Sequence, residues 1–209
     1  MKFNVIAISR TTGAGGEDLG AAIATELGFR YVDGEIIDQA AAQAGVTPAE
    51  VARAEARKGL LARILENLAK SGTGSLAAGG VPEPAMMMDL QGPTYESLIV
   101  DVIRETADHG NVVIVAHGAS IPLAGREGLL RVMVTASAET RAKRIHATSK
   151  ESLGQAVKDI EASDKSRSDY FRRFYQVDQE LSTHYDIVVN TDVLTVPHAL
   201  GLILALAKM

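Results

Sequence analysis

Cysteine and tryptophan are both absent from this chain of 209 residues, and aromatic side chains make up only 4% of it. Without cysteine the chain can form neither disulfides nor thiolate metal sites. Apolar residues make up 46% of the chain, with alanine frequent among them. We therefore expect one domain with a sizeable core, in which helices pack closely on strands rich in valine and isoleucine.

An excess of positive charge is missing as well, because the formal net charge at pH 7 is −5. A broad nucleic-acid surface needs a basic face, so a nucleic-acid partner is not expected. No apolar run is long enough to span a bilayer, which argues against a membrane partner. An apolar segment starts at Phe3 and leaves no room for a signal peptide, so we expect a soluble, cytoplasmic protein.

Short apolar runs that are typical of buried strands alternate with helical patterns along the chain. This alternation predicts an α/β fold with a parallel sheet and helices on both faces, in one domain over residues 1–209. Ligands in such folds bind beyond the carboxyl ends of the strands. A segment rich in glycine, serine and proline at 71–93 predicts a long loop, and a helix is expected before it, at 47–70. The expected strands are 3–8, 29–32, 111–116, 130–135 and 185–189.

A glycine-rich turn follows the first expected strand and precedes a helix. This arrangement directs backbone N–H groups and the positive end of a helix at an anion. The P-loop pattern is G-x-x-x-x-G-K-[ST], and here Arg10 stands at its first glycine, Gly16 at its lysine and Glu17 at its Ser/Thr. Arg10 is positioned to supply the missing positive charge. A tight turn without a ligand is the alternative. The candidate phosphate-binding residues are Thr12, Gly13, Ala14, Gly15 and Gly16.

An apolar stripe at helical spacing is interrupted by two charges, Asp164 and Arg167. Charges on a core-facing stripe are costly unless they are paired or used. The two residues could simply pair with each other, or the pair could set the register of a partner helix. Alternatively, Asp164 could hold Arg167 in place so that its guanidinium binds a phosphate, and we favour this interpretation. The stripe consists of Leu153, Val157, Ile160, Asp164, Arg167, Phe171 and Phe174.

A basic cluster in the 141–150 segment stands out in an otherwise acidic chain. Cations of this kind neutralise charge during phosphoryl transfer, although an ordinary solvated helix face would look the same. Arg141 and Arg144 are the members of this cluster that we expect to contact a ligand.

Two further polar residues follow expected strands, Asp33 and His117. Asp33 could orient a substrate hydroxyl, hold water on Mg²⁺, or simply cap the next helix. A histidine such as His117 is more often a hydrogen-bonded structural residue than a catalyst. No cluster suggests a resident metal site.

Several of these motifs together resemble the cytidylate kinase-like family, a branch of the P-loop nucleoside monophosphate kinases. The likeness covers nearly the whole chain apart from 71–93, and it implies a five-stranded parallel sheet of order 2-3-1-4-5 with a helical lid at about 144–170. It also implies nucleotide phosphate at Gly13–Gly16, lid arginines around Arg144 and Arg167, and a monophosphate site near Asp33 and His117. The matching segments are 6–10, 13–16, 28–33, 141–145, 164–167 and 185–191.

Two positions depart from the family pattern, and both remove positive charge from the expected phosphate sites. The family usually has a basic residue where Glu17 stands, and Gly-Arg where Ala116 and His117 stand. His117 would hold a phosphate only weakly and only when protonated.

These features predict a phosphotransferase that uses ATP and Mg²⁺ to phosphorylate a small phosphorylated acceptor such as a nucleoside monophosphate. Its expected catalytic residues are Arg10, Arg144, Arg167 and Asp164, with Asp164 orienting Arg167. Arg141 is expected to contact the nucleotide, and Asp33 and His117 the acceptor. The alternative is a weak or inactive nucleotide-binding or anion-binding regulatory module that forms a homodimer.

Overall fold

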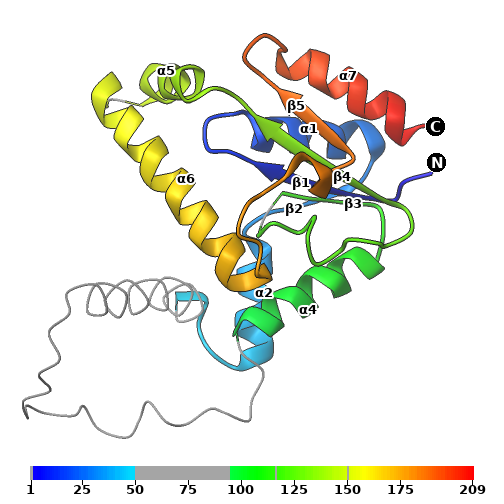
Figure 1. Cartoon of the computed structure of the whole chain (residues 1–209). Helices are drawn as coiled ribbons and strands as arrows, with labels where there is room; N and C mark the ends of the chain where they lie inside the picture. The colour runs from blue at the N-terminus through cyan, green and yellow to red at the C-terminus, as the bar shows by residue number, and fades with distance from the viewer. Residues whose placement is uncertain (1, 50–94, 116, 150) are drawn as a thin grey trace, which may run out of the picture. The chain divides into compact units, whose positions relative to one another are not determined.

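A computed structural model of the chain describes residues 2–49, 95–115, 117–149 and 151–209. Its strands are β1 (Val5–Arg10), β2 (Arg30–Val32), β3 (Val112–Ile114), β4 (Leu129–Thr135) and β5 (Ile187–Asn190). Its helices are α1 (Gly16–Leu27), α2 (Glu35–Ala44), α4 (Tyr95–Asp108), α5 (Ala138–Thr148), α6 (Leu153–Tyr175), the 3₁₀ turn η2 (Ser182–His184) and α7 (Val196–Ala207). Helices separate most consecutive strands, but within the described residues β4 follows β3 with no helix between them (Figure 1).

The described strands form a five-stranded sheet in the order β2-β3-β1-β4-β5, and every neighbouring pair is parallel. This confirms the fold class that the sequence predicts and the strand order that the family resemblance implies. β1 lies at the centre, pairing Val5 with Val112 on one side and with Leu129 on the other. Because both faces of a central parallel strand are covered, the β1 run Val5–Ile8 is apolar or small throughout and almost fully buried.

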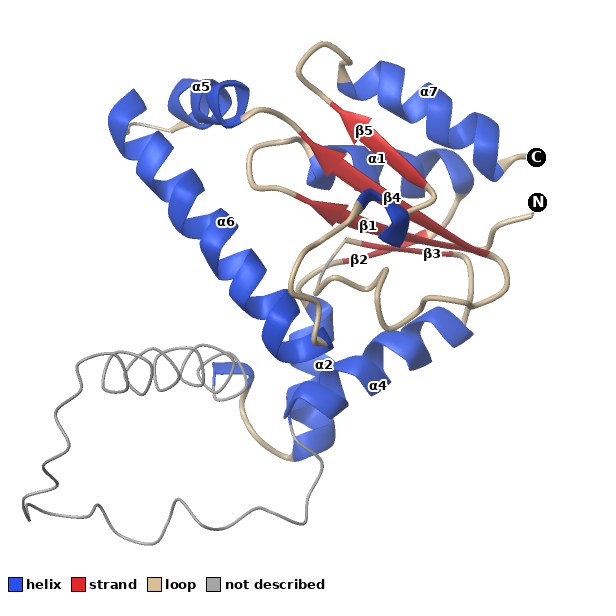
Figure 2. Ribbon diagram, in the orientation of Figure 1, coloured by secondary structure: helices blue, strands red, loops and turns tan. Residues whose placement is uncertain are grey.

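Helices α1 and α7 pack on one face of the sheet, where they share a core with β1, β4 and β5 (Figure 2). Ile23 of α1 and Ile203 of α7 are fully buried in it. Residues 100–108 of α4 lie on the opposite face, with Val102 and Ile103 fully buried (Figure 1). The expected covering of both faces is therefore confirmed.

The sequence suggests one long helical segment over about 150–181, and helix α6 begins and ends inside it. It pairs with α5 through a small apolar cluster of Ala142, Ala156 and Ile160, with Ile145 packed against it. The predicted stripe is wrong at its N-terminal end, because Leu153 and Val157 are 44% and 39% exposed. Small Ala156 takes the buried position instead, which lets α6 approach α5 closely.

The chain divides into two compact units, of which one is Met1–Ile36 with Val100–Met209 and the other is Ile37–Ile99. The sheet and its carboxyl edge belong to the first unit, where all the site residues described below lie. In the second unit α2 ends at Ala44, and Gly45 follows with a φ of 67°, the left-handed conformation of a helix stop. The expected helix at 47–70 lies almost wholly outside the described residues, and the expected loop at 71–93 lies entirely outside them. The segment expected to form a lid, 144–170, covers the end of α5 and most of α6.

No helix among the described ranges is long and apolar enough to cross a membrane.

Candidate functional site

The glycine turn joins β1 to α1 at the carboxyl edge of the sheet. Gly13 and Gly15 have φ values of 81° and 82°, a left-handed conformation that costs other residues energy. Ala14 between them is buried, with 1% of its surface exposed, and Gly15 is the N-cap of α1. The side chain of Ala14 is therefore packed into the protein, and α1 begins directly after the turn.

Five consecutive carbonyl groups of the turn accept hydrogen bonds. The carbonyls of Thr11 and Gly15 bind the amides of Ala14 and Leu19, at 3.0 and 3.2 Å. The other three, at Thr12, Gly13 and Ala14, bind side chains from α5 and from the segment after β5. Because the acceptors are occupied and the first amides of a helix have no intrahelical partner, the turn offers donors rather than acceptors to a ligand.

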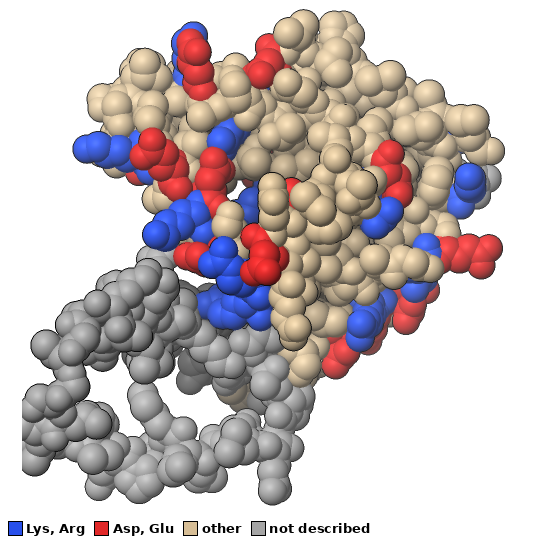
Figure 3. Space-filling model, in the orientation of Figure 1, with Lys and Arg blue, Asp and Glu red and all other residues tan. Residues whose placement is uncertain are grey.

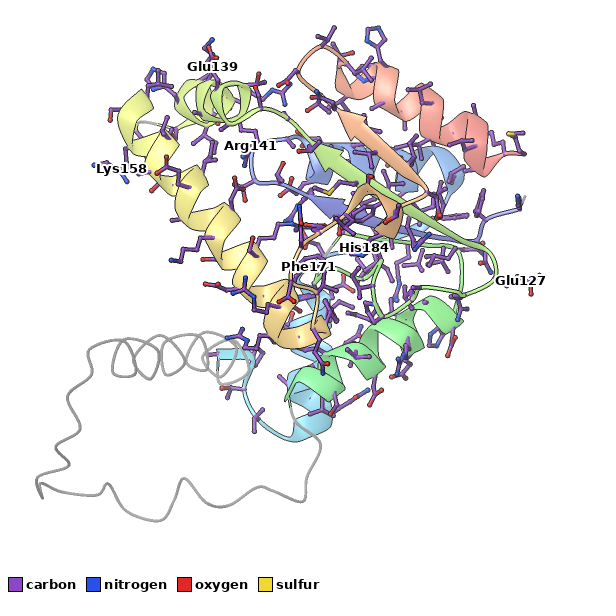
Figure 4. All side chains as sticks on the ribbon, viewed as in Figure 1. Glu127, Glu139, Arg141, Lys158, Phe171 and His184 are labelled. Carbon is purple, nitrogen blue, oxygen red and sulfur yellow. The ribbon has the colours of Figure 1, made fainter. Side chains whose placement is uncertain are left out.

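Arg141 is the principal support of the turn. Its Nη1 donates to the Thr12 carbonyl at 3.3 Å, and its Nε donates to the Ala136 carbonyl at 3.1 Å. Both terminal nitrogens also bind the Asp164 carboxylate, at 2.9 and 2.7 Å. Only 5% of the Arg141 side chain is exposed, and it extends from α5 toward the turn after β1 (Figure 4). Arg141 thus links α5, α6 and the glycine turn.

Arg144 lies one helical turn further along α5. It donates to Thr191 Oγ1 at 3.0 Å and to the Thr191 carbonyl at 2.5 Å, with longer contacts to the carbonyls of Gly13 and Ala14. Thr191 Oγ1 donates in turn to the Ala14 carbonyl at 2.9 Å. Both arginines predicted on α5 therefore reach the glycine turn, where they bind its main chain; their contacts to a nucleotide stay a prediction.

A third link reaches the turn from α6, where Ser163 Oγ lies 2.6 Å from Thr12 Oγ1. The proposed lid helix and the glycine turn are therefore in direct contact in this structure. The sequence did not single out Ser163, although it occupies the position before Asp164.

Arg10 and Glu17 flank the turn and form an ion pair, with Arg10 Nε 2.6 Å from Glu17 Oε1. A β-carbon placed on Gly16 would lie 2.6 Å from the Arg10 β-carbon and 3.0 Å from its δ-carbon. The Arg10 side chain thus passes over the position where a P-loop has its lysine side chain. Glycine at 16 and arginine at 10 are matched, because the space that one side chain leaves is filled by the other.

Asp33 follows β2 at the same edge of the sheet and accepts a hydrogen bond from the Tyr31 hydroxyl. Burial, followed by the negative charges of Asp33 and Glu17, raises the pKa of Tyr31 above its ordinary value. The carbonyl of Asp33 also accepts a long bond of 3.5 Å from the Ile36 amide, at the start of α2. Tyr31 is a site residue that the sequence did not single out; its place in a short strand that ends at a carboxylate was the available signal.

Asp164 and Arg167 do not pair with each other, so the prediction that Asp164 orients Arg167 is wrong. Asp164 binds Arg141, as described, whereas Arg167 binds Glu180 through two bonds of 2.8 and 2.7 Å. The Tyr185 hydroxyl donates to the same Glu180 carboxylate. Charged partners on other segments were closer in space than the neighbour along the helix.

His117 lies just beyond β3 in a cluster of aromatic side chains at the C-terminal end of α6. Its backbone φ is 52°, which is uncommon for a residue other than glycine. The Tyr175 hydroxyl donates to its carbonyl, and the Tyr170 hydroxyl lies 3.5 Å from its Nδ1. The ring of Phe171, which is 2% exposed, receives the Arg167 guanidinium at 4.6 Å.

Positive and negative side chains are interleaved over α5 and α6 on the face shown in Figure 3. Three of the four arginines predicted for the site follow this pattern, because Arg10, Arg141 and Arg167 each have a carboxylate partner, whereas Arg144 binds Thr191. Within the described ranges no group of three or more histidines, aspartates or glutamates could hold a metal ion. Nucleotide-bound Mg²⁺ does not require such a group, since one or two carboxylates with phosphates and water commonly hold it.

Asp192 closes the edge of the site on the side of β4 and β5. Its carboxylate accepts bonds from the amide and the hydroxyl of Ser137, both at 2.9 Å. Hydrogen bonds from Thr140 and Ser137 lower the pKa of Asp192 from 3.8 to about 2. The start of α5, which carries Arg141 and Arg144, is thereby fixed to the segment after β5.

Comparison with known proteins gives one family. The model of the cytidylate kinase-like family matches residues 5–193. A cytidylate kinase of Ignicoccus hospitalis is 27% identical over 193 residues, which cover 90% of each chain.

Two solved structures share the fold. An uncharacterized protein from Eubacterium ventriosum superposes with a TM-score of 0.68 at 16% identity, and 98% of each chain is covered. A shikimate kinase from Bacteroides thetaiotaomicron gives a TM-score of 0.52 at 15% identity, again with 98% of each chain covered.

Proposed function

The chain belongs to the cytidylate kinase-like family and has a P-loop kinase fold, and we propose that it is a phosphotransferase that moves the γ-phosphoryl group of ATP to a nucleoside monophosphate. Cytidine monophosphate is the first acceptor to test, because the relative from Ignicoccus hospitalis is named a cytidylate kinase. The reaction would use Mg²⁺ and would take place in the cytoplasm, where ATP is made available.

The observation that carries this proposal is the orientation of the glycine turn. Donors from outside the turn hold the carbonyls of Thr12, Gly13 and Ala14, and the turn opens directly into α1. The amides at Gly15 and Gly16, with the positive end of the helix, then stabilise the phosphates of the donor nucleotide.

Arginines would neutralise the charge that develops on the transferred group. Arg10 lies beside Gly16, where its guanidinium takes the place of the P-loop lysine. Arg167 on α6 and Arg144 on α5 are the further cations proposed for the transition state. Asp164 would act through Arg141 and the turn, and not through Arg167.

The acceptor would lie at the carboxyl ends of β2 and β3. Asp33, which accepts a hydrogen bond from Tyr31, would accept one from a hydroxyl of the acceptor, and His117 follows the neighbouring strand. Such contacts orient the attacking group, and orientation is a main part of catalysis in phosphoryl transfer.

The donor set at the turn fits Mg²⁺ delivered with the nucleotide, because the half-exposed Glu17 carboxylate follows the proposed phosphate-binding glycines directly. Bound there, the ion would neutralise part of the negative charge of the phosphates. Glu17 and water would supply its remaining ligands.

A coupled assay of ADP release with ATP and a panel of nucleoside monophosphates tests the proposal. We expect turnover with at least one acceptor, fastest with a pyrimidine monophosphate, and dependent on Mg²⁺. Absence of turnover with every acceptor, in a protein whose circular dichroism and cooperative unfolding are intact, would overturn it.

A second candidate is a regulatory module that binds a nucleotide without turning it over, and one observation favours it. Glu17 forms an ion pair with Arg10, so the positive charge nearest the turn is neutralised in this structure. Calorimetric titration with ATP, ADP and CMP separates the two functions, since binding without turnover supports the module. Sedimentation at several concentrations then tests the homodimer that this candidate includes.

A further inference from the structure

Of the three ion pairs at the proposed nucleotide site, Arg10–Glu17 is held least tightly. Arg141–Asp164 and Arg167–Glu180 each have two aligned hydrogen bonds, and their arginine side chains are 5% and 20% exposed. Arg10 meets Glu17 through Nε alone, and the Glu17 side chain is 46% exposed. The geometry at Nε is too poorly aligned for a hydrogen bond. An exposed single contact of this kind contributes little stability, so it is the pair that a ligand can open.

Glu17 stands where its carboxylate could bind a cation that accompanies the phosphates, in place of Arg10. It lies in the first turn of α1, one residue after Gly16, and its neighbour Asp18 points into solvent. A phosphate held at the turn would draw Arg10 away from Glu17, because both anions compete for one guanidinium. The released carboxylate would then face the phosphates at close range, which is unfavourable unless a cation lies between them.

We infer that Glu17 exchanges partners when nucleotide binds, leaving Arg10 and becoming a ligand of the Mg²⁺ that accompanies the phosphates. This inference rests on the proposed function and deepens it, because it adds that Glu17 changes partner between the free and the nucleotide-bound protein. Carboxylate oxygen is a preferred ligand of Mg²⁺, so Glu17 takes the role of the hydroxyl that a P-loop has at this place. The loss of two P-loop residues and the presence of Arg10 and Glu17 then have one explanation.

The exchange predicts how the metal ion affects nucleotide affinity. Without Mg²⁺ the wild-type protein must separate Arg10 from Glu17 and leave Glu17 beside phosphate, so ATP alone binds weakly. With Mg²⁺ the same carboxylate contributes to binding. Glu17→Gln removes both effects, and the variant should bind metal-free ATP more tightly than the wild type and Mg·ATP less tightly.

The test is a calorimetric titration of ATP into wild type and Glu17→Gln, each in MgCl₂ and in EDTA. In EDTA we expect the variant to bind about two- to fivefold more tightly, the range for one exposed ion pair. In MgCl₂ we expect it to bind more weakly than the wild type, so that the metal dependence falls by about tenfold or more. Asp18→Asn, one residue further in the same helical turn, is the matched control and should behave as the wild type.

The outcomes separate this inference from the proposed function. If Glu17→Gln improves binding by the same factor with and without Mg²⁺, Glu17 is only a competitor and the exchange is overturned. If Glu17→Gln and Asp18→Asn both match the wild type, Glu17 has no part in binding and the exchange is again overturned, while nucleotide binding stands. If the wild type binds no ATP in either buffer, the proposed function itself fails. Equal unfolding midpoints for the three proteins show that the comparison reports binding and not folding.

Discussion

Arg141 and Asp164 hold each other through two hydrogen bonds between α5 and α6, and the same guanidinium binds the carbonyl of Thr12 in the glycine turn. One ion pair thereby connects the start of the proposed phosphate site with the helix proposed as its lid. The pair is 23 residues apart in sequence, so it closes a long segment of the chain.

Replacing the carboxylate of this pair should destabilise the protein. In Asp164→Asn the Arg141 side chain, only 5% exposed, loses its counter-charge, and we expect the free energy of unfolding to fall by about 1–3 kcal/mol. Urea denaturation measures it. Glu161→Gln removes an exposed carboxylate from the same helix and should change stability by less than about 0.5 kcal/mol. Equal effects of the two substitutions would contradict the supporting role of Asp164.

A side chain at position 16 should be tolerated only when Arg10 is shortened. Gly16→Ala places a β-carbon 2.6 Å from that of Arg10, and we expect it to cost about 1–3 kcal/mol of stability. Shifting of the Arg10 main chain would be needed to relieve it, since the clash is not with the flexible end of the side chain. In an Arg10→Gly background the same substitution should cost less, and a double-mutant cycle by thermal unfolding gives the coupling. A coupling near zero would show that Arg10 does not fill this space.

Arg167 should matter for turnover more than for stability. We expect Arg167→Ala to lower kcat by about 10²–10³, because a cation that stabilises charge in the transition state is lost. Steady-state kinetics with saturating ATP and acceptor measure this, with KM little changed. Arg172→Ala is the matched control, since Arg172 is 60% exposed on the same helix. Comparable loss in both variants would remove Arg167 from the proposed machinery.

Tyr31 should act on the acceptor through Asp33. Tyr31→Phe keeps the ring that packs near Gly20 and removes the hydroxyl that binds Asp33. We expect the KM for the acceptor to rise by about three- to tenfold, the effect of one hydrogen bond, with the KM for ATP unchanged. A rise in the KM for ATP alone would place Tyr31 at the donor nucleotide instead.

Asp192 should make stability depend on pH in the acid range. Its folded-state pKa of about 2 lies below the ordinary value of 3.8, so its contribution is complete above pH 3.8 and is lost as the pH falls through about 2. The difference in unfolding midpoint between wild type and Asp192→Asn should therefore narrow between these two values. A ¹³C titration of the Asp192 carboxyl gives the pKa directly. A midpoint near 3.8 would show that the bonds from Ser137 and Thr140 are not formed in solution.

The sheet could be predicted from the sequence because its signals are local. Runs such as Val5–Ile8 and Val112–Ile114 are apolar and β-branched, and Gly28 and Gly110 mark where helices stop. The strand order came from the family likeness. The ends of the helices were less certain, because Leu153 and Val157 continue an apolar pattern that packing does not use.

The partners of the charged residues could not be predicted in the same way. Spacing along α6 suggests Asp164 with Arg167, but a guanidinium reaches far enough that residues on other segments compete, and burial of Arg141 favours the tighter pair. Glu180 lies in an irregular segment beyond the end of α6, whereas the sequence suggests helix to about 181, so its bond to Arg167 was unforeseen. The ion pair of Arg10 with Glu17 would have been easier to infer from the sequence, because the glycine turn between these residues brings its two ends together.

The held carbonyls of the glycine turn have an energetic consequence. A loop that must order itself around an anion loses conformational entropy at that moment, whereas this turn is already fixed by Arg141, Arg144 and Thr191. Its backbone should therefore be ordered on the picosecond-to-nanosecond timescale even without a ligand, and the ¹⁵N order parameters of residues 11–16 should change little on binding. The conformational change on ligand binding is then confined to the two side chains that flank the turn, Arg10 and Glu17.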